Sequence, residues 1–323
     1  MQVKDIIRDA KGKIDHVGGL KHVYFVACGG SQAAIFCGHY LLNKEATTFG
    51  SSIYNSSEFL NATPAMLDKR CIVVLCSLNA TAETVEAVKL SREKGAITIA
   101  MTGFPDTEMA KNGEYVVVYS NGDEQIYSQS NQSNALRIGF EILHQFENYP
   151  KYEAAIDSFT KIDQIVANGK KYIERIANDF AKEYKDDETF YVMASGPMYS
   201  TAYTMSYCHL MEMQWKHAIP MHSGEYFHGP FETTDKNLPI ILFVSEGSTR
   251  QLDERALTFL NKYADRVTVI DAKELGVNII DDRVVEFFNS VIMIPIERNI
   301  VSRMAEIRNH SMDMRRYMWK VEY

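Results

Sequence analysis

Glu212 and His228, two side chains able to transfer protons, lie sixteen residues apart in the most polar segment of the sequence. Apolar residues recur at helical spacing over 199–213, which predicts that Glu212 ends a helix facing a core. Burial among apolar groups raises the pKa of a carboxyl group, so that it can exchange protons near neutral pH. His228 precedes Gly-Pro, which predicts a turn that presents its imidazole to a cleft. The pair could move protons on a substrate; an exposed glutamate at a helix end and a structural histidine are the competing interpretations.

The same segment offers a metal site as a second kind of chemistry. His222, Glu225 and His228 are all ligand types, but their spacing is not HExxH, and Gly-Pro after His228 breaks a helix. The pattern therefore favours no metal. Glu225 is also a second candidate for the base, although we prefer a loop carboxylate that contacts neighbouring backbone and substrate.

Two loops in the first half have the composition of an anion site. Residues 27–32 (ACGGSQ) and 76–84 (CSLNATAET) each follow a predicted strand and open a predicted helix. Glycine lets the backbone approach a ligand, and hydroxyls add donors to the free N–H groups of a helix start. Helix capping would explain one such loop, but two in one domain favour a phosphate site. The residues expected to bind it are Gly29, Gly30, Ser31, Ser77, Asn79 and Thr81.

The elements that must position these residues are strands alternating with helices, in two matching halves. The predicted strands are 22–27, 47–53, 71–75, 96–101 and 115–119, then 190–194, 217–221, 240–244, 266–270 and 291–295. The offset between matching strands is about 170 residues, which is typical of a duplicated domain. This pattern predicts an α/β fold with two tandem doubly wound, flavodoxin-like domains, each with a five-stranded parallel sheet. Ligands of such sheets bind beyond the carboxyl ends of the strands.

Four segments follow from this reading. Residues 1–150 form the first domain, 151–187 a helical connector, 188–311 the second domain and 312–323 a C-terminal tail. The tail carries large apolar and basic residues, so we expect it to dock at the site or on a neighbouring subunit. A tail folded onto its own domain is the alternative.

Composition limits the classes of function. The chain has 323 residues, of which 46% are hydrophobic and 24% charged, as in a globular protein with real cores. A net charge of −8 disfavours nucleic acid and anionic membranes as partners. No apolar run reaches the roughly 18–20 residues of a membrane-spanning helix, and the N-terminus lacks a signal peptide, so a cytoplasmic protein is expected. Five cysteines without a CxxC pair argue against disulfides and structural zinc.

The sequence resembles the sugar isomerase (SIS) domain family. The resemblance rests on 23–31 (VYFVACGGS), 56–59 (SSEF) and 81–84 (TAET), and the second half is similar to a second SIS domain. It implies that the phosphate of a sugar phosphate lies on the loops of Gly29 and Ser77. The usual loop reads roughly Ser-x-Ser-Gly-x-Thr, whereas 76–81 read CSLNAT, so a hydroxyl and the glycine are replaced.

Glu212 and His228 resemble, at the same separation, the catalytic glutamate and histidine in the isomerase half of glucosamine-6-phosphate synthase. The resemblance implies that Glu212 moves a proton between C1 and C2 and that His228 helps to open the sugar ring. It also implies a lysine near the C-terminus, for which Lys320 is the nearest match. A solvated terminal charge is the alternative for Lys320.

Within this family the chain is most similar to the fructosamine-6-phosphate deglycases, through 223–232 (SGEYFHGPFE) and the aromatic C-terminus. The resemblance implies hydrolysis of a phosphorylated Amadori adduct to glucose 6-phosphate and an amino acid. No cofactor is expected, because the substrate nitrogen acts as the electron sink. A phosphosugar substrate and a homodimer or larger homo-oligomer are the expected partners. An aldose–ketose phosphate isomerase is the alternative, and a non-catalytic sugar-phosphate sensor is disfavoured by the presence of both Glu212 and His228.

Overall fold

The computed structural model describes residues 1–322. The chain divides into two compact units, of which the first ends at Lys161 and the second begins at Ile162. This division falls within the predicted connector 151–187, which is helical. Its helix α7 (Tyr152–Phe159) belongs to the first unit, and α8 (Ile162–Tyr184) belongs to the second.

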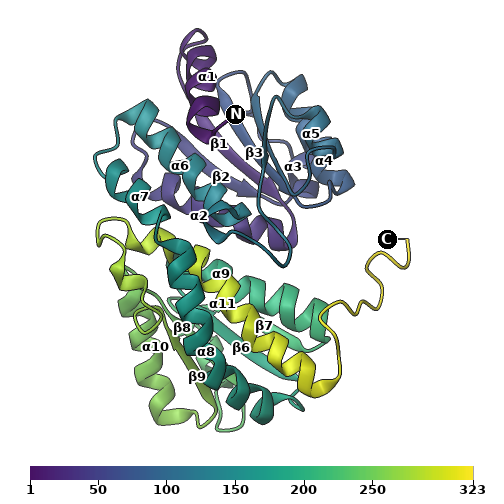
Figure 1. The fold of residues 1–323 in the computed structure, drawn as a ribbon, viewed down its shortest axis with the longest axis vertical. Helices are drawn as coiled ribbons and strands as arrows, with labels where there is room; N and C mark the ends of the chain where they lie inside the picture. The colour runs from purple at the N-terminus through teal and green to yellow at the C-terminus, as the bar shows by residue number, and fades with distance from the viewer. Residues whose placement is uncertain (323) are drawn as a thin grey trace. The chain divides into compact units, whose positions relative to one another are not determined.

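The first unit is a five-stranded parallel sheet in the order β2-β1-β3-β4-β5 (Figure 1). The strands are β1 (His22–Ala27), β2 (Gly50–Tyr54), β3 (Cys71–Ser77), β4 (Ile97–Thr102) and β5 (Tyr115–Val118). One helical layer contains α1 (Val3–Asp15), α2 (Gly29–Glu45) and α6 (Asn131–Glu147), and the other contains α3 (Ser56–Asn61), α4 (Ala82–Glu93) and α5 (Glu108–Asn112). A short 3-10 helix covers Tyr127–Gln129. All five predicted strands of this half are confirmed, with shifted ends.

The central strand β3 is buried at all seven of its residues. A parallel sheet is covered on both faces, so its inner strands need apolar side chains on both sides. Register pairs Ala27 at the end of β1 with Cys76 near the end of β3. The two loops predicted to bind an anion therefore leave neighbouring strands at the same edge of the sheet.

The second unit has a four-stranded parallel sheet in the order β7-β6-β8-β9, which repeats the order of β2-β1-β3-β4. Its strands are β6 (Thr189–Ala194), β7 (His217–His222), β8 (Ile240–Val244) and β9 (Val267–Asp271). The remaining helices are α9 (Tyr199–Tyr203), α10 (Arg250–Tyr263), α11 (Val285–Arg308), a π-helix (Thr204–Met213) and 3-10 turns at Gly196–Met198, Pro230–Thr233 and Val277–Ile279. No helix within residues 1–322 is long and apolar enough to cross a membrane.

The prediction of a fifth strand at 291–295 is wrong, because these residues lie inside α11. The first ten residues of α11 are all buried, and it packs against α8 and the π-helix. A helix buried on all sides shows no 3.6-residue period, so a short window of it cannot be told from a buried strand. The second sheet consequently has four strands rather than the predicted five.

Candidate active site

The first unit places a chain of hydroxyl groups at the carboxyl edge of its sheet. Ser77 Oγ accepts the backbone N–H of Thr81 at 2.9 Å and lies 3.3 Å from Thr81 Oγ1. Thr84 Oγ1 links Thr81 Oγ1 at 3.0 Å to Ser56 Oγ at 2.9 Å. These contacts join neutral groups, and hydroxyls can rotate to donate to an incoming anion. Asn79, also predicted to bind phosphate, is exposed beside them.

The glycine loop lies next to this hydroxyl chain. Gly29 begins α2 with a φ of +54°, a left-handed conformation that favours glycine. Cys28 before it is exposed, and its sulfur accepts the backbone N–H of Ser56 at 3.4 Å. Burial raises the pKa of Cys76 to about 12, an effect opposed by the nearby hydroxyl of Ser31. Gly29, Ser31 and Ser77 therefore lie at one edge of the first sheet, and the phosphate site at this edge stays a prediction.

The second unit has a matching edge, but its donors are already used. Ser195, Ser223 and Ser245 each follow a strand, and all three hydroxyls donate to the carboxylate of Asp253 at 2.9, 2.6 and 2.6 Å. The backbone N–H of Ser245 donates to the same carboxylate at 3.0 Å. Asp253 is completely buried, and burial raises its pKa in spite of these hydrogen bonds.

Asp253 thus occupies in the second unit the position of Thr84 in the first. Each lies on the helix after the third strand in order, and each contacts a serine after the edge strand, Ser223 or Ser56. A fixed carboxylate both consumes the donors and repels an anion. The three serines of the second unit are therefore held by Asp253, whereas the Ser77, Thr81 and Thr84 hydroxyls of the first unit contact uncharged groups.

Glu212 lies near the end of the π-helix, as predicted for a helix end, and lines an open pocket of about 600 Å³. The other lining residues come from the same segment and from the tail: Tyr207, Met211, Trp215, Lys216, His217, Arg315, Arg316, Tyr317 and Met318. Glu212 Oε1 pairs with Arg315 Nη2 at 2.7 Å, and its side chain is 23% exposed. Burial raises the pKa of the neighbouring Cys208 thiol to about 12, and the negative charge of Glu212 adds to this shift.

The tail is held where it leaves α11. Arg308 donates to the backbone carbonyl and side-chain oxygen of Gln214 at 2.9 and 2.8 Å, and Gln214 donates to the His310 carbonyl at 2.9 Å. Trp215, beyond Gln214, packs its ring edge-on against His310. These contacts set the start of the tail beside the helix end that carries Glu212.

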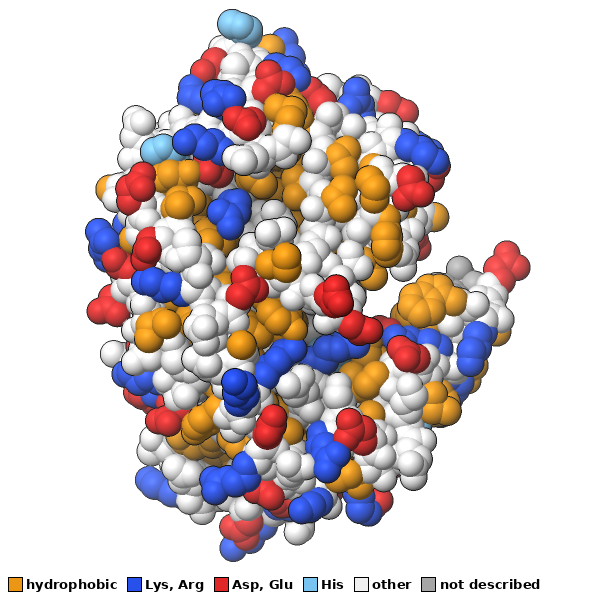
Figure 2. Space-filling model, in the orientation of Figure 1, with side chains coloured by type: hydrophobic (Ala, Val, Ile, Leu, Met, Phe, Trp, Pro, Cys, Tyr) orange, Lys and Arg blue, Asp and Glu red, His pale blue; other side chains and the backbone are white. Residues whose placement is uncertain are grey.

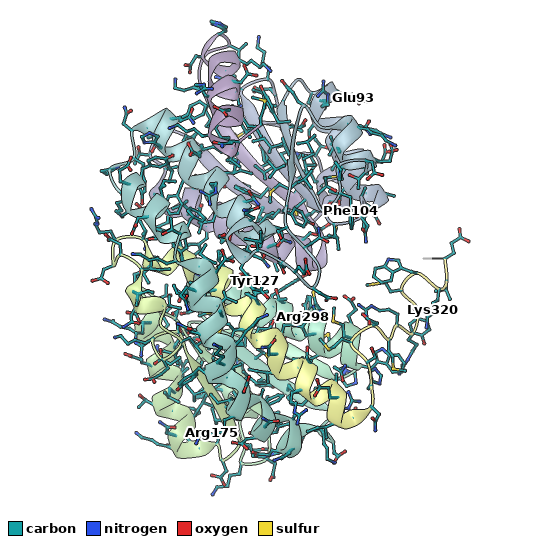
Figure 3. All side chains as sticks on the ribbon, viewed as in Figure 1. Glu93, Phe104, Tyr127, Arg175, Arg298 and Lys320 are labelled. Atoms are coloured by element: carbon teal, nitrogen blue, oxygen red, sulfur yellow. The ribbon has the colours of Figure 1, made fainter. Side chains whose placement is uncertain are left out.

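Lys320, the third predicted catalytic residue, lies on the extended tail beyond the pocket lining (Figure 3). Its Nζ donates to the carbonyl of Arg315 at 2.5 Å. Arg315 therefore contacts Glu212 through its guanidinium and Lys320 through its backbone. The structure brings these predicted residues to the same arginine, although not into direct contact with each other.

His228 and Glu225 lie at the other end of β7 from Glu212. Glu212 precedes the amino end of the strand, whereas both other residues follow its carboxyl end in a turn where His228 N–H donates to the Glu225 carbonyl at 2.9 Å. A six-residue strand spans about 17 Å from first to last residue. His228 is exposed and does not line the Glu212 pocket in the described part of the chain. One copy of the chain thus does not bring Glu212 and His228 together.

A buried contact between a histidine and a glutamate underlies the π-helix close to this pocket. His209 Nδ1 lies 2.8 Å from Glu297 Oε1 of α11, and both side chains are almost completely buried. Arg298, which follows Glu297 on α11 (Figure 3), approaches His209 Nε2 at 3.4 Å. Burial raises the pKa of Glu297, and His209 opposes that shift. The pair fixes the π-helix against α11 one turn before Glu212.

Sequence reasoning missed three parts of this arrangement. Arg315 is one of three basic residues in the tail and has no sequence signal of its own, because a salt bridge between distant residues leaves no local pattern. Ser56 and Thr84 were present in the quoted motifs, and their hydroxyls could have been counted with Ser77 and Thr81. Asp253 had no signal at all, since a lone helical aspartate looks like a solvated one.

Comparisons with known proteins agree with these features. A SIS domain model matches residues 20–137. Fructosamine deglycase FrlB of Bacillus subtilis strain 168 is 40% identical over 323 residues, covering 100% of this chain and 97% of that protein. Fructoselysine 6-phosphate deglycase of Escherichia coli K12 is 24% identical over 260 residues, covering 80% of this chain and 75% of that protein.

Two crystal structures of proteins described as phosphosugar isomerases share the whole fold. The one from Bacillus subtilis has a TM-score of 0.94 at 40% identity and covers 99% of this chain and 97% of that chain. The one from Salmonella typhimurium LT2 has a TM-score of 0.95 at 38% identity and covers 99% and 98%. Together with the full-length match to a deglycase, these findings show that the chain belongs to the SIS domain family.

Proposed function

We propose that this protein is a 6-phosphofructosamine deglycase. It cleaves a phosphorylated Amadori adduct with water, giving glucose 6-phosphate and a free amino acid. The observation that carries the proposal is the match along the whole chain to fructosamine deglycase FrlB. The residues predicted for this chemistry support it, because the first unit offers an open hydroxyl edge and the second a pocket with a carboxylate.

In the proposed reaction the first unit binds the phosphate through Gly29, Gly30, Ser31, Ser77, Asn79 and Thr81. Backbone N–H groups at the start of α2 and rotatable hydroxyls are the donors, so no arginine is needed there. The second unit is not assigned a phosphate, because Asp253 takes the matching donors.

Proton transfer is assigned to Glu212 and His228. His228 shuttles the ring proton, so that the sugar opens to its 2-keto form. Glu212 removes a proton from C1 to give an enaminol and returns it to C2, which leaves an imine at C1. Water then hydrolyses the imine and releases the amine. Each transfer contributes on the order of 10²–10⁴ in rate.

Glu225 and Lys320 receive smaller assignments. Glu225 is exposed in the turn of His228, where it would contact substrate rather than act as the base. The resemblance assigns Lys320 a role in the reaction. Its contact with the Arg315 carbonyl supports a position near the pocket.

A homodimer is part of the proposal, with His228 of a second copy reaching Glu212. The separation of the two residues along β7 supports it, because a single chain leaves Glu212 without the histidine. Apolar and basic side chains gather along the tail (Figure 2), where Tyr317 is 64% and Trp319 74% exposed. A second copy would cover these rings. The cytoplasmic location remains a prediction from the sequence.

Glucose 6-phosphate release tests this function directly. The purified protein is incubated with a panel of 6-phosphofructosamines and, separately, with fructose 6-phosphate. Product is expected from the adducts and not from fructose 6-phosphate. An equally fast conversion of fructose 6-phosphate would instead indicate an aldose–ketose isomerase, and product from no adduct would contradict the proposal.

A further inference from the structure

The pocket around Glu212 carries more positive charge than one carboxylate requires. Among its lining residues Lys216, Arg315 and Arg316 are cationic, whereas Glu212 is the single carboxylate. Lys216 is buried and already paired with Glu188 at 2.8 Å. Arg315 pairs with Glu212 in the same way, so the three cations exceed these two carboxylates by one positive charge.

Arg315 has an incomplete set of hydrogen bonds although most of its side chain is shielded from solvent. Its side chain is only 9% exposed. Nη1 donates to the carbonyls of Met312 and Met314 at 2.8 and 2.9 Å, and Nη2 meets one oxygen of Glu212. Nε is buried and has no partner among the described residues. Buried donors are normally satisfied, so Nε is a donor available to a ligand that enters the pocket.

The free donor lies on the side of the guanidinium that binds carboxylates best. Nε and Nη2 form one fork, which matches the two oxygens of a carboxylate. In this structure a single Glu212 oxygen occupies Nη2, so half of the fork is used. Arg316 lies close by, with its guanidinium 4.4 Å from the centre of the Trp215 ring, and adds positive potential.

A phosphofructosamine of an amino acid has two anionic groups. Under the proposed function the first unit takes the phosphate, which leaves the carboxylate of the amino acid. In the adduct of an α-amino acid that carboxylate is three bonds from C1, the carbon on which Glu212 acts. Because Arg315 touches Glu212, a carboxylate on Arg315 would lie within reach of that carbon.

We propose that Arg315 binds the carboxylate of the amino acid carried by the phosphofructosamine, and that this exchange frees Glu212 to act as the base. The inference rests on the proposed function. Nη2 moves its hydrogen bond from Glu212 to the substrate, and Nε gains the partner that it lacks. A substrate without the carboxylate leaves Glu212 paired and reacts more slowly.

Two substrates that differ only in the carboxylate test this role. They are the 6-phosphofructosamines of glycine and of methylamine, and kcat/KM for glucose 6-phosphate release is measured for each. The wild type is expected to prefer the glycine adduct by about 10- to 100-fold, the range for hydrogen bonds to a charged group. Arg315→Gln is expected to lose most of that preference, because kcat/KM falls on the glycine adduct while the methylamine adduct, whose reaction is no longer slowed by the Arg315–Glu212 pair, reacts no more slowly than with the wild type. Arg315→Lys, which keeps the charge without the fork, is expected to fall between them.

Arg303→Gln is the matched control, because Arg303 is an exposed arginine of α11 that pairs with Glu306. It is expected to keep the wild-type preference. An Arg315→Gln variant that slows both adducts by the same factor, or a wild type that does not discriminate, would overturn the inference. A wild type inactive on both adducts would contradict the proposed function itself, which separates the two failures.

Discussion

At the residue scale, Glu212 and Arg315 form a charged pair in one candidate part of the site, and Gly29 shapes the backbone of the other. The Glu212 carboxylate pairs with the Arg315 guanidinium at 2.7 Å, which holds the proposed base in place. In the first unit the proposed phosphate loop offers uncharged donors, and its shape depends on the backbone of Gly29. The Glu212 pocket therefore depends on the charges of its side chains, whereas the Gly29 loop depends on its backbone conformation.

Gly29→Ala tests the conformational requirement. A φ of +54° costs a residue with a side chain about 1–2 kcal/mol, and no atom lies within 4 Å of the added Cβ, so backbone strain is the whole cost. We expect the free energy of unfolding in urea to fall by about that amount, and KM for the phosphosugar to rise.

Gly12→Ala provides the comparison, since Gly12 is exposed in α1 and also has open space around it. It is expected to raise the free energy of unfolding by about 0.5–1 kcal/mol, as for alanine in a helix. Equal effects at the two positions would show that the backbone at Gly29 imposes no special requirement.

At the scale of elements, two sheets with the same strand order have opposite contents at their carboxyl edges. The first unit has hydroxyls that contact each other and the Thr81 backbone N–H, and the second has three serines that donate to Asp253. The two units therefore share a strand order but differ in the groups at this edge, and the proposed phosphate site is assigned to the first unit.

Asp253→Asn is expected to change how the free energy of unfolding depends on pH, because it removes a buried carboxyl group. The pKa of Asp253 is raised in the folded protein, so the folded state holds its proton more tightly than the unfolded chain. The wild type consequently loses free energy of unfolding as pH rises from about 4, where an unfolded aspartate titrates, to the raised pKa. The difference between variant and wild type is expected to increase over that window and then level off.

Urea unfolding at a series of pH values measures this difference. Asp106→Asn, at an exposed loop position, is the matched control and should show no such increase. A difference for Asp253→Asn that stays constant or falls with rising pH would contradict the assignment of the raised pKa.

The sequence predicts most elements but not their distant contacts. Alternation and apolar runs locate nine of the ten predicted strands, because each is a local pattern. The strand predicted at 291–295 is wrong because α11 is buried on all sides there, so its apolar residues show no 3.6-residue period. The short spacing of Glu212 and His228 in the sequence suggests that they are close in space. The extended strand β7 lies between them, however, and separates the two side chains. The Arg315 contact depends on how the tail leaves α11, which no local pattern encodes.

At the scale of the whole molecule, the separated residues require a second copy in the proposed mechanism. Glu212 of one chain and His228 of another would form each site, so a symmetric dimer contains two sites. The exposed tail rings Tyr317 and Trp319 offer surface for such an assembly.

Mixed assemblies of two inactive variants test this arrangement. Glu212→Gln and His228→Asn chains are unfolded together and refolded, or co-expressed. Each mixed dimer would contain one site with both native residues, so random pairing should restore about a quarter of wild-type activity. Either variant alone should remain inactive. No recovery in mixtures shown to contain mixed dimers would contradict a shared site.

The most direct test of the proposed deglycase follows the proton that Glu212 is assigned to move. The reaction is run in deuterium oxide with a 6-phosphofructosamine, and deuterium at C2 of the released glucose 6-phosphate is measured by NMR for the wild type, Glu212→Gln and Glu225→Gln. The account predicts labelled product from the wild type and from Glu225→Gln. Glu212→Gln should fold and bind phosphosugar but turn over at least about a hundredfold more slowly, without C1 proton exchange. Labelled product from Glu212→Gln at the wild-type rate would contradict it.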